Sequence, residues 1–165
     1  MDLLIFLLMA GIGAGMMLNP SSQGSAQVPQ VSSQPAAGFE AENQTPTGKF
    51  MTAGEVKPIV EAIKPQWIAV RLWDGQDLLY FTNLLSWRCG THQIRYAVNG
   101  GDFQVLQAEP CHADDAAPNA LKTADGILPY VTFKANSIQT VEVQVLYDDL
   151  SETSQSYARA QVQID

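Results

Sequence analysis

The stretch SWRCGTHQIRYAVNGGDFQVLQAEPCH, Ser86 to His112, contains both cysteines and both histidines of this 165-residue chain. Asn99-Gly100-Gly101 lies near its centre, and Asn-Gly is strongly preferred in two-residue hairpin turns. Residues 93–98 and 103–107, on either side, are rich in β-branched, aromatic and other apolar side chains. The stretch therefore predicts a β-hairpin whose two ends carry the cysteines.

The pairing within this hairpin depends on the length of its turn. A two-residue turn at Asn99-Gly100 places Ile94 opposite Val105 and leaves Cys89 and Cys111 one residue out of register. A three-residue loop, or a glycine bulge, supplies the missing residue. We expect one of these devices to bring the two cysteines face to face.

The amino-terminal segment predicts export. Residues 3–18 form an uncharged run rich in Leu, Ile and Met, and the first basic residue of the chain is Lys49. The run is shorter than the roughly 20 residues of a membrane span and is typical of the apolar core of a secretion signal. Gly24-Ser25-Ala26 offers small residues for cleavage, so we predict a signal peptide over residues 1–26. Because Asp2 stands where a positive charge is usual, an uncleaved anchor is the alternative.

Export bears on the cysteines, because thiols oxidise outside the cytoplasm. We predict a structural disulfide between Cys89 and Cys111, which would stabilise the fold by about 3 kcal/mol. The alternative is a zinc or copper site made by Cys89, His92, Cys111 and His112. These four residues lack the ligand spacing of zinc knuckles, so we predict neither a metal nor any other cofactor.

Composition divides the rest of the chain in two. Pro, Ser, Gln, Ala and Gly dominate residues 27–48, which cannot bury enough apolar surface to offset backbone entropy. We predict a disordered linker there and a β-rich domain over residues 49–165. Thr52 and Glu55 have the spacing of a capping box, and apolar residues follow at helical spacing, so a short helix over residues 53–64 is predicted to open the domain. Pro58 weakens that helix.

Short strands are predicted after the helix, at 67–73, 77–82, 93–98, 103–107, 130–135, 140–147 and 158–164. Asp74-Gly75 is a second hairpin turn, and Asp148 to Gln155 is predicted as a polar loop. Such a chain, without alternating helices, predicts a mainly β fold: an antiparallel β-sandwich (immunoglobulin-like) or a small barrel with one short N-terminal helix.

Charge and motifs exclude several functions. The chain has 9 Lys and Arg against 17 Asp and Glu, a net charge of -8, and no basic run. Nucleic acid is therefore an unsuitable partner, and membrane contact is expected only if the N-terminal segment stays uncleaved. Gly-x-Ser-x-Gly, P-loop and His-Glu-x-x-His motifs are absent. Asp114-Asp115 and Asp148-Asp149 lie in predicted loops, where carboxylates are usually solvated, so no catalytic residue and no enzyme activity is predicted.

The tryptophans are the remaining candidates for a site. Trp67 and Trp73 share one face of their predicted strand while Val70 and other aliphatic residues take the opposite face. A two-layer fold cannot bury both faces without further cover. Core packing is one interpretation; the other is a binding surface formed by Trp67, Trp73 and Trp87.

LLYFTNLLSWRCG, Leu78 to Gly90, together with RYAVNGG, EPCH, PNALK and YDD, resembles a group of short exported bacterial proteins with a two-cysteine β-domain. The resemblance implies export and a shared fold, and it brings no activity, cofactor or site. We expect a periplasmic or secreted, non-enzymatic binding or assembly module of the cell envelope, whose partner is an unknown protein or glycan. The alternative is a metal-binding or hydrolytic periplasmic protein that uses the Cys89/Cys111 hairpin.

Overall fold

The computed structural model describes residues 38–123 and 126–165. The predicted signal peptide or anchor, and the first part of the predicted linker, lie outside the described residues. Within the described part of the chain, no helix is long and apolar enough to cross a membrane. The described residues belong to one compact unit.

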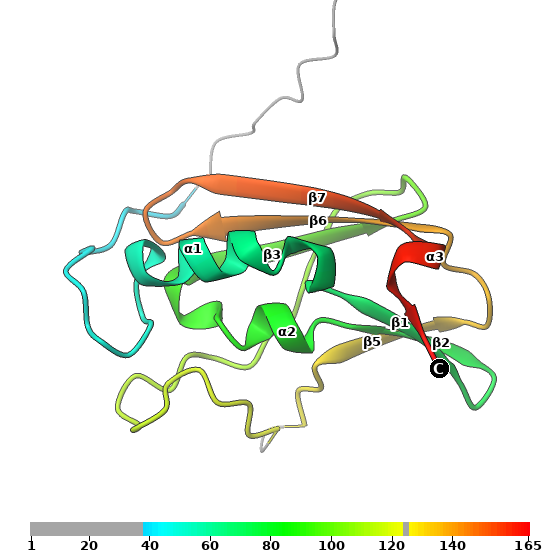
Figure 1. Cartoon of the computed structure of the whole chain (residues 1–165), viewed down its shortest axis with the longest axis horizontal. Coiled ribbons are helices and arrows are strands. Elements are labelled where there is room, and N and C mark those ends of the chain that lie inside the picture. The colour runs from blue at the N-terminus through cyan, green and yellow to red at the C-terminus, as the bar shows by residue number, and fades with distance from the viewer. Residues whose placement is uncertain (1–37, 124–125) are drawn as a thin grey trace, which may run out of the picture. The chain divides into compact units, whose positions relative to one another are not determined.

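The unit consists of two four-stranded sheets and a few short helices (Figure 1). The strands of sheet A, in spatial order, are β5 (Tyr130–Lys134), β2 (Gln76–Tyr80), β1 (Ala69–Trp73) and β8 (Gln163–Ile164). Those of sheet B are β4 (Gln104–Val105), β3 (Thr91–Val98), β6 (Thr140–Tyr147) and β7 (Glu152–Ala158). The helices are α1 (Ala53–Ala62), η1 (Lys64–Gln66), α2 (Thr82–Leu85), η2 (Arg88–Gly90) and α3 (Arg159–Val162).

This architecture confirms the mainly β fold. Neighbouring strands are antiparallel except for β1 and β8, which are parallel. A closed barrel is not found within residues 38–123 and 126–165, since the two sheets share no hydrogen-bonded strand pair. The immunoglobulin-like assignment stays a prediction.

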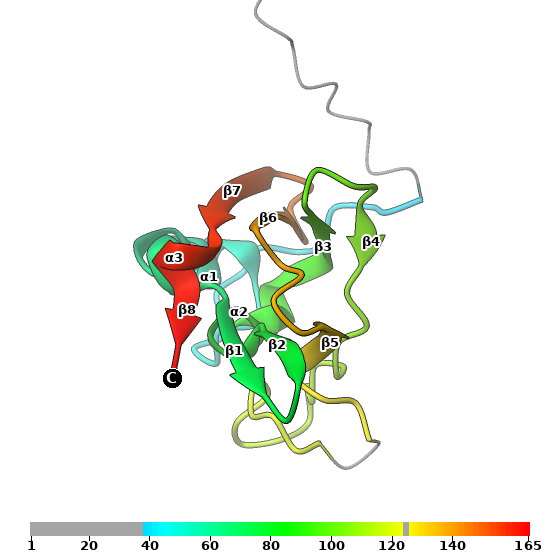
Figure 2. The ribbon, with the colours of Figure 1, turned by 90° about the vertical axis from the view of Figure 1, so that its right-hand side faces the viewer.

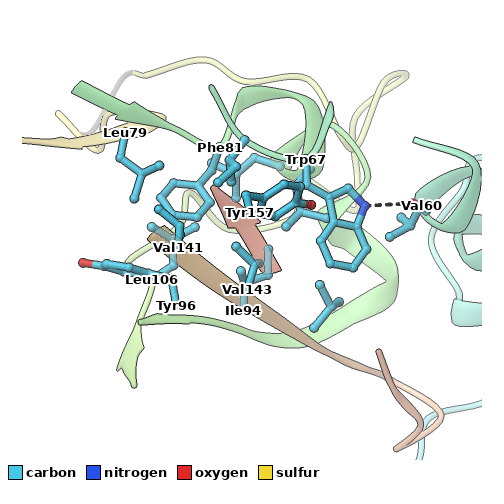
Figure 3. Close-up of a cluster of buried hydrophobic side chains, with 14 of the residues drawn as sticks. Val60, Trp67, Leu79, Phe81, Ile94, Tyr96, Leu106, Val141, Val143 and Tyr157 are labelled. Carbon is cyan, nitrogen blue, oxygen red and sulfur yellow. Dashed lines mark hydrogen bonds between the residues drawn. The ribbon is translucent and has the colours of Figure 1, made fainter. Parts of the chain in front are cut away.

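One apolar core lies between the sheets and the helices. Val143 of β6 and Ile94 of β3 meet Phe81, Trp67 and Tyr157 there, as Figure 3 shows. Helix α1 adds its buried stripe to the same core, and α2 adds two leucines. The alternation of apolar residues along β6, which predicted one buried face, therefore packs as expected.

The region before α1 differs from the prediction. Residues 38–48 were expected to belong to the disordered linker, yet they contact the domain: the Gln44 amide donates to Asp148 Oδ1 at 2.8 Å, and the Glu42 amide donates to the Asp148 carbonyl. Glu55 also holds this segment, because its carboxylate accepts the amides of Thr47 and Gly48. These polar contacts do not depend on apolar composition, so composition alone missed them. The predicted capping residues do begin α1 at Ala53.

Both predicted hairpins are present. Asp74 and Gly75 have positive φ angles and join Trp73 directly to Gln76, as a two-residue turn requires. The second hairpin pairs Arg95, not Ile94, with Val105. Its loop thus adds the one residue that the cysteine positions demanded, although β4 is only two residues long.

The carboxyl-terminal predictions need correction. β7 begins at Glu152, inside the predicted polar loop. It is an edge strand whose polar side chains alternate between exposed and half-buried positions, so its composition is that of a loop. The strand predicted over 158–164 divides into α3 and β8. The Ala158 amide donates to Gln161 Oε1 at the start of α3, which ends the extended conformation. The first predicted strand begins at Ala69 instead of Trp67, since η1 delays it.

Candidate functional site

The disulfide predicted between Cys89 and Cys111 is present, with the two Cα atoms 4.9 Å apart. It joins η2 to the long segment that follows β4, and both cysteines lie outside the paired strands of the hairpin. Bonded sulfur atoms cannot serve as thiolate ligands, so the metal site of Cys89, His92, Cys111 and His112 is wrong. Within the described residues no other cluster of metal-ligating side chains occurs.

The two histidines have separate structural contacts. His92 stacks on Phe39 with ring centroids 4.8 Å apart, and its Nε2 lies 2.8 Å from the Glu40 carbonyl oxygen. His112 Nε2 contacts the carboxylate of Glu109. The histidines therefore belong to different clusters.

Arg88 organises the segment around the disulfide, and we call Arg88, Glu109 and the disulfide the polar hub. The Arg88 side chain is only 4% exposed. Its guanidinium donates hydrogen bonds to the carbonyl oxygens of five residues, Leu85, Glu109, Pro110, Asn119 and Ala120. A buried arginine with this many acceptors fixes the path of a chain that has no secondary structure of its own.

Glu109 completes the polar hub. Its carboxylate accepts the amides of Lys122 and Thr123 and contacts His112. The hydrogen bond with His112 and those two amides, together with nearby Arg88, lower the pKa of Glu109 from its ordinary 4.5 to about 2. A carboxylate so fully bonded is a structural anion and is not available as a catalytic base.

The other carboxylate pairs also serve the fold. Asp148 Oδ1 accepts the amide of Ala53 at the start of α1, and Asp149 forms an ion pair with Lys57 at 2.8 Å. Asp115 forms an ion pair with Lys122. None of these arrangements places two carboxylates around an open space where a substrate would bind.

The three tryptophans lie in different environments and do not form one surface. Trp67 is fully buried and donates its indole N–H to the Val60 carbonyl at 2.8 Å (Figure 3). Its place in the predicted binding surface is wrong, because it precedes β1 and does not follow the alternation of that strand. Trp87 is half-buried against Phe50. Trp73 alone is well exposed, at 57%.

Trp73 belongs to the outer face of sheet A, which we call the sheet-A face. Val70 and Leu79 pair across β1 and β2 and point into the core, so their neighbours along each strand point outward. The strand registers then define the members of the face: Ala69, Arg71, Trp73, Gln76, Leu78, Tyr80, Tyr130, Thr132, Lys134 and Ile164.

Aromatic rings lie at both ends of the sheet-A face. Tyr80 and Tyr130 pair across the strands with ring centroids 5.1 Å apart. Trp73 lies at the hairpin end, four residues or roughly 14 Å away along the strand direction at about 3.4 Å per residue. Exposed Ile164 pairs with Arg71 beside it. The face is partly apolar, and apart from Leu78, which is only 7% exposed, it carries half-buried or exposed side chains that suit a macromolecular contact.

The cations of this face differ from the other basic residues. Arg71 stacks on Trp73 with the guanidinium 4.6 Å from the ring centroid, and its Nε has no hydrogen-bond partner. Neither Arg71 nor Lys134 forms an ion pair within the described residues. Six of the other seven basic residues form one: Lys57, Lys64, Arg88, Arg95, Lys122 and Arg159.

Carboxylates are correspondingly absent from the described members of the sheet-A face. Asp77 of β2 points to the opposite side, where Arg159 binds it through both oxygens and lowers its pKa to about 2. Asp74 and Asp165 lie only at its margins, in the turn and at the chain end. An acidic protein thus has one sheet face on which positive charge is uncompensated.

Sequence reasoning identified Trp73 and missed its cationic neighbours. Arg71 lies two residues before Trp73 on the same predicted strand, so its side chain was expected on the same face. The strand that ends at the Asp74-Gly75 turn was therefore a usable signal for Arg71 as well. Tyr130 and Lys134 join the face through pairing between distant segments, for which the sequence carries no local signal. No family model matches the chain, and no curated protein or solved structure is similar to it.

Proposed function

We propose that this protein is a non-enzymatic binding or assembly module of the cell envelope, exported from the cytoplasm, that engages a partner through the sheet-A face. The observation that carries the proposal is the exposure of Trp73 beside Arg71, which has no ion-pair partner among the described residues. Tryptophan, tyrosine and arginine are the residues that most often dominate the binding energy of protein interfaces.

Two further observations support this proposal. The Cys89–Cys111 disulfide is compatible with an oxidising compartment. Two carboxylates whose pKa is lowered to about 2, Glu109 and Asp77, are held by hydrogen bonds to internal partners. Perturbed groups that serve the fold differ from those of an active site, which must reach substrate.

Site-specific photocrosslinking in cells tests the proposed surface. A photoreactive phenylalanine replaces Gln76 or Thr132 on the sheet-A face, and Ser154 on the outer face of sheet B is the control position. We expect discrete adducts from the first two positions and none from the third. Equal adducts from all three positions, or none from the sheet-A face, would overturn the proposal.

Amino-terminal sequencing of the mature chain tests export. A chain that begins at Gln27 supports a cleaved signal peptide, whereas retention of Asp2 supports the membrane anchor. Recovery of the intact chain in the cytoplasm with reduced cysteines would contradict both.

A further inference from the structure

Sheet A ends in a strand with an unpaired edge. β5 pairs only with β2 among the described strands. The Phe81 amide donates to the Pro129 carbonyl, and hydrogen-bonded pairs alternate along antiparallel strands. The backbone groups of Val131 and Phe133 therefore point toward β2, and those of Tyr130 and Thr132 point away from the sheet. This edge has the donors and acceptors that an added extended chain would use.

A hollow lies beside this edge, between β5 and β4, which occupy the same side of the molecule (Figure 2). Its volume is about 600 Å³. Val105, Leu128 and Val131 contribute apolar side chains to its lining, and Val105 and Leu128 are 60% and 47% exposed. A hollow of this kind suits one apolar side chain of a partner.

The charges near the edge of β5 indicate the charge of the partner. Lys134 ends β5, and Arg71 lies two strands away on the same face; neither has an ion-pair partner among the described residues. Lysine on an edge strand opposes pairing with neutral or basic strands and would be compensated by an acidic one. Carboxylates are also the groups that a guanidinium binds most specifically.

We propose that the partner is a protein with an extended acidic segment, which adds to the edge of β5 and inserts one apolar side chain into the hollow. This inference rests on the proposed function of the sheet-A face and names the class of partner. A charged polysaccharide would satisfy the cations but would leave the free backbone edge and the apolar side chains of Val105, Leu128 and Val131 without matching groups. The observations together therefore favour a polypeptide.

Synthetic peptides test the inference on the disulfide-intact protein. The probe is a short peptide of alternating glutamate and threonine with one central leucine. One matched peptide replaces glutamate by lysine, and a second replaces leucine by serine. We expect calorimetry to show binding of the probe only, with slower hydrogen exchange of the Thr132 amide in the complex.

Protein variants separate the two recognition elements. Replacing both cations, Arg71→Gln with Lys134→Gln, is expected to weaken binding of the probe about tenfold. Leu128→Ser should weaken it about fivefold through the lost apolar contact. Lys49→Gln and Leu150→Ser remove an exposed cation and an exposed leucine elsewhere, and they should leave the affinity unchanged.

Several results would overturn the inference. They are equal binding of the lysine peptide, an unchanged affinity in the double variant, or no binding of the probe at all. Binding of polygalacturonate that ignores Leu128 would identify a glycan instead, and concentration-dependent self-association abolished by Lys134→Gln would identify a second copy. If crosslinks form at Gln76 while the acidic peptide fails to bind, only this inference fails; without those crosslinks the proposed function fails as well.

Discussion

Arg88 in the polar hub and Arg71 on the sheet-A face are the same residue type in opposite circumstances. Arg88 is buried and donates to five carbonyl groups, and it lies near the carboxylate of Glu109. Arg71 is half-exposed, and within residues 38–123 and 126–165 its guanidinium has the Trp73 ring as its only interaction partner. The contrast separates two tasks: charges satisfied internally hold the fold, and charges left unsatisfied at the surface are available to a partner. Changes in the hub should affect stability, and changes in the face should affect binding.

The largest loss of stability is expected from Arg88→Met. The substitution leaves several buried carbonyl groups and Glu109 without their donor, so the free energy of unfolding should fall by about 3 to 5 kcal/mol. Urea denaturation followed by fluorescence measures this value. If the variant does not fold, Arg88→Lys keeps the charge, loses the forked geometry and should give an intermediate loss. If neither variant changes the free energy of unfolding, the polar hub does not stabilise the fold, and its proposed difference from the sheet-A face is wrong.

Removal of the disulfide by Cys89→Ala with Cys111→Ala should have the next largest effect. The bond closes a loop between residues 22 positions apart. Its loss should lower the free energy of unfolding by about 3 kcal/mol, mainly because the unfolded chain gains conformational freedom. Chemical denaturation of the variant and of the reduced wild-type protein should agree. Crosslinking from Gln76 should persist wherever the variant remains folded.

Glu109→Gln tests the role of the polar hub through the pH dependence of the free energy of unfolding. The pKa of Glu109 is about 2 in the folded protein and about 4.5 when unfolded, so the ionised group contributes stability above pH 4.5. That contribution disappears as the pH falls from about 4.5 towards 2. The variant should therefore show a shallower loss of stability across this interval. Glu142→Gln, which removes a carboxylate that accepts no hydrogen bond within the described residues, should keep the wild-type slope.

The smallest effect on stability is expected on the sheet-A face. Trp73→Ser removes a largely exposed ring and should change the free energy of unfolding by no more than about 0.5 kcal/mol. Arg71→Gln should change the free energy of unfolding by an equally small amount. Both variants should nevertheless lose the crosslinks formed from Gln76. A large destabilisation by Trp73→Ser would mean that the ring serves the fold and would break the comparison.

Local patterns predicted much of the fold. The Thr52 and Glu55 spacing located the start of α1, Asp74-Gly75 fixed the first hairpin, and alternation identified the buried face of β6. The one-residue mismatch between the cysteines and a two-residue turn correctly implied an extra residue in the second hairpin. Each of these signals acts between residues that are neighbours in sequence or joined by one turn.

Tertiary contacts decided what the sequence could not reveal. Strand β7 is an edge strand with polar residues, so its sequence resembles that of a loop. Four of the five residues whose carbonyls accept hydrogen bonds from Arg88 lie more than 20 positions away, and no residue pattern encodes such contacts. For the candidate site, Trp73 was identifiable. Trp67 was wrongly grouped with it, because Trp67 follows η1 with helical backbone angles and precedes β1, so the alternation of the strand does not reach it.

The polar hub has a consequence for protein engineering. Arg88 and Glu109 bind main-chain atoms on both sides of residues 113–117. The ion pair that Asp115 of this excursion forms with Lys122 is exposed, and an exposed pair contributes little to stability, so the path depends mainly on the main-chain contacts. Foreign peptides grafted in place of these residues should leave the scaffold intact. The domain thus offers a display position that is anchored at both ends and tolerant of sequence in the middle.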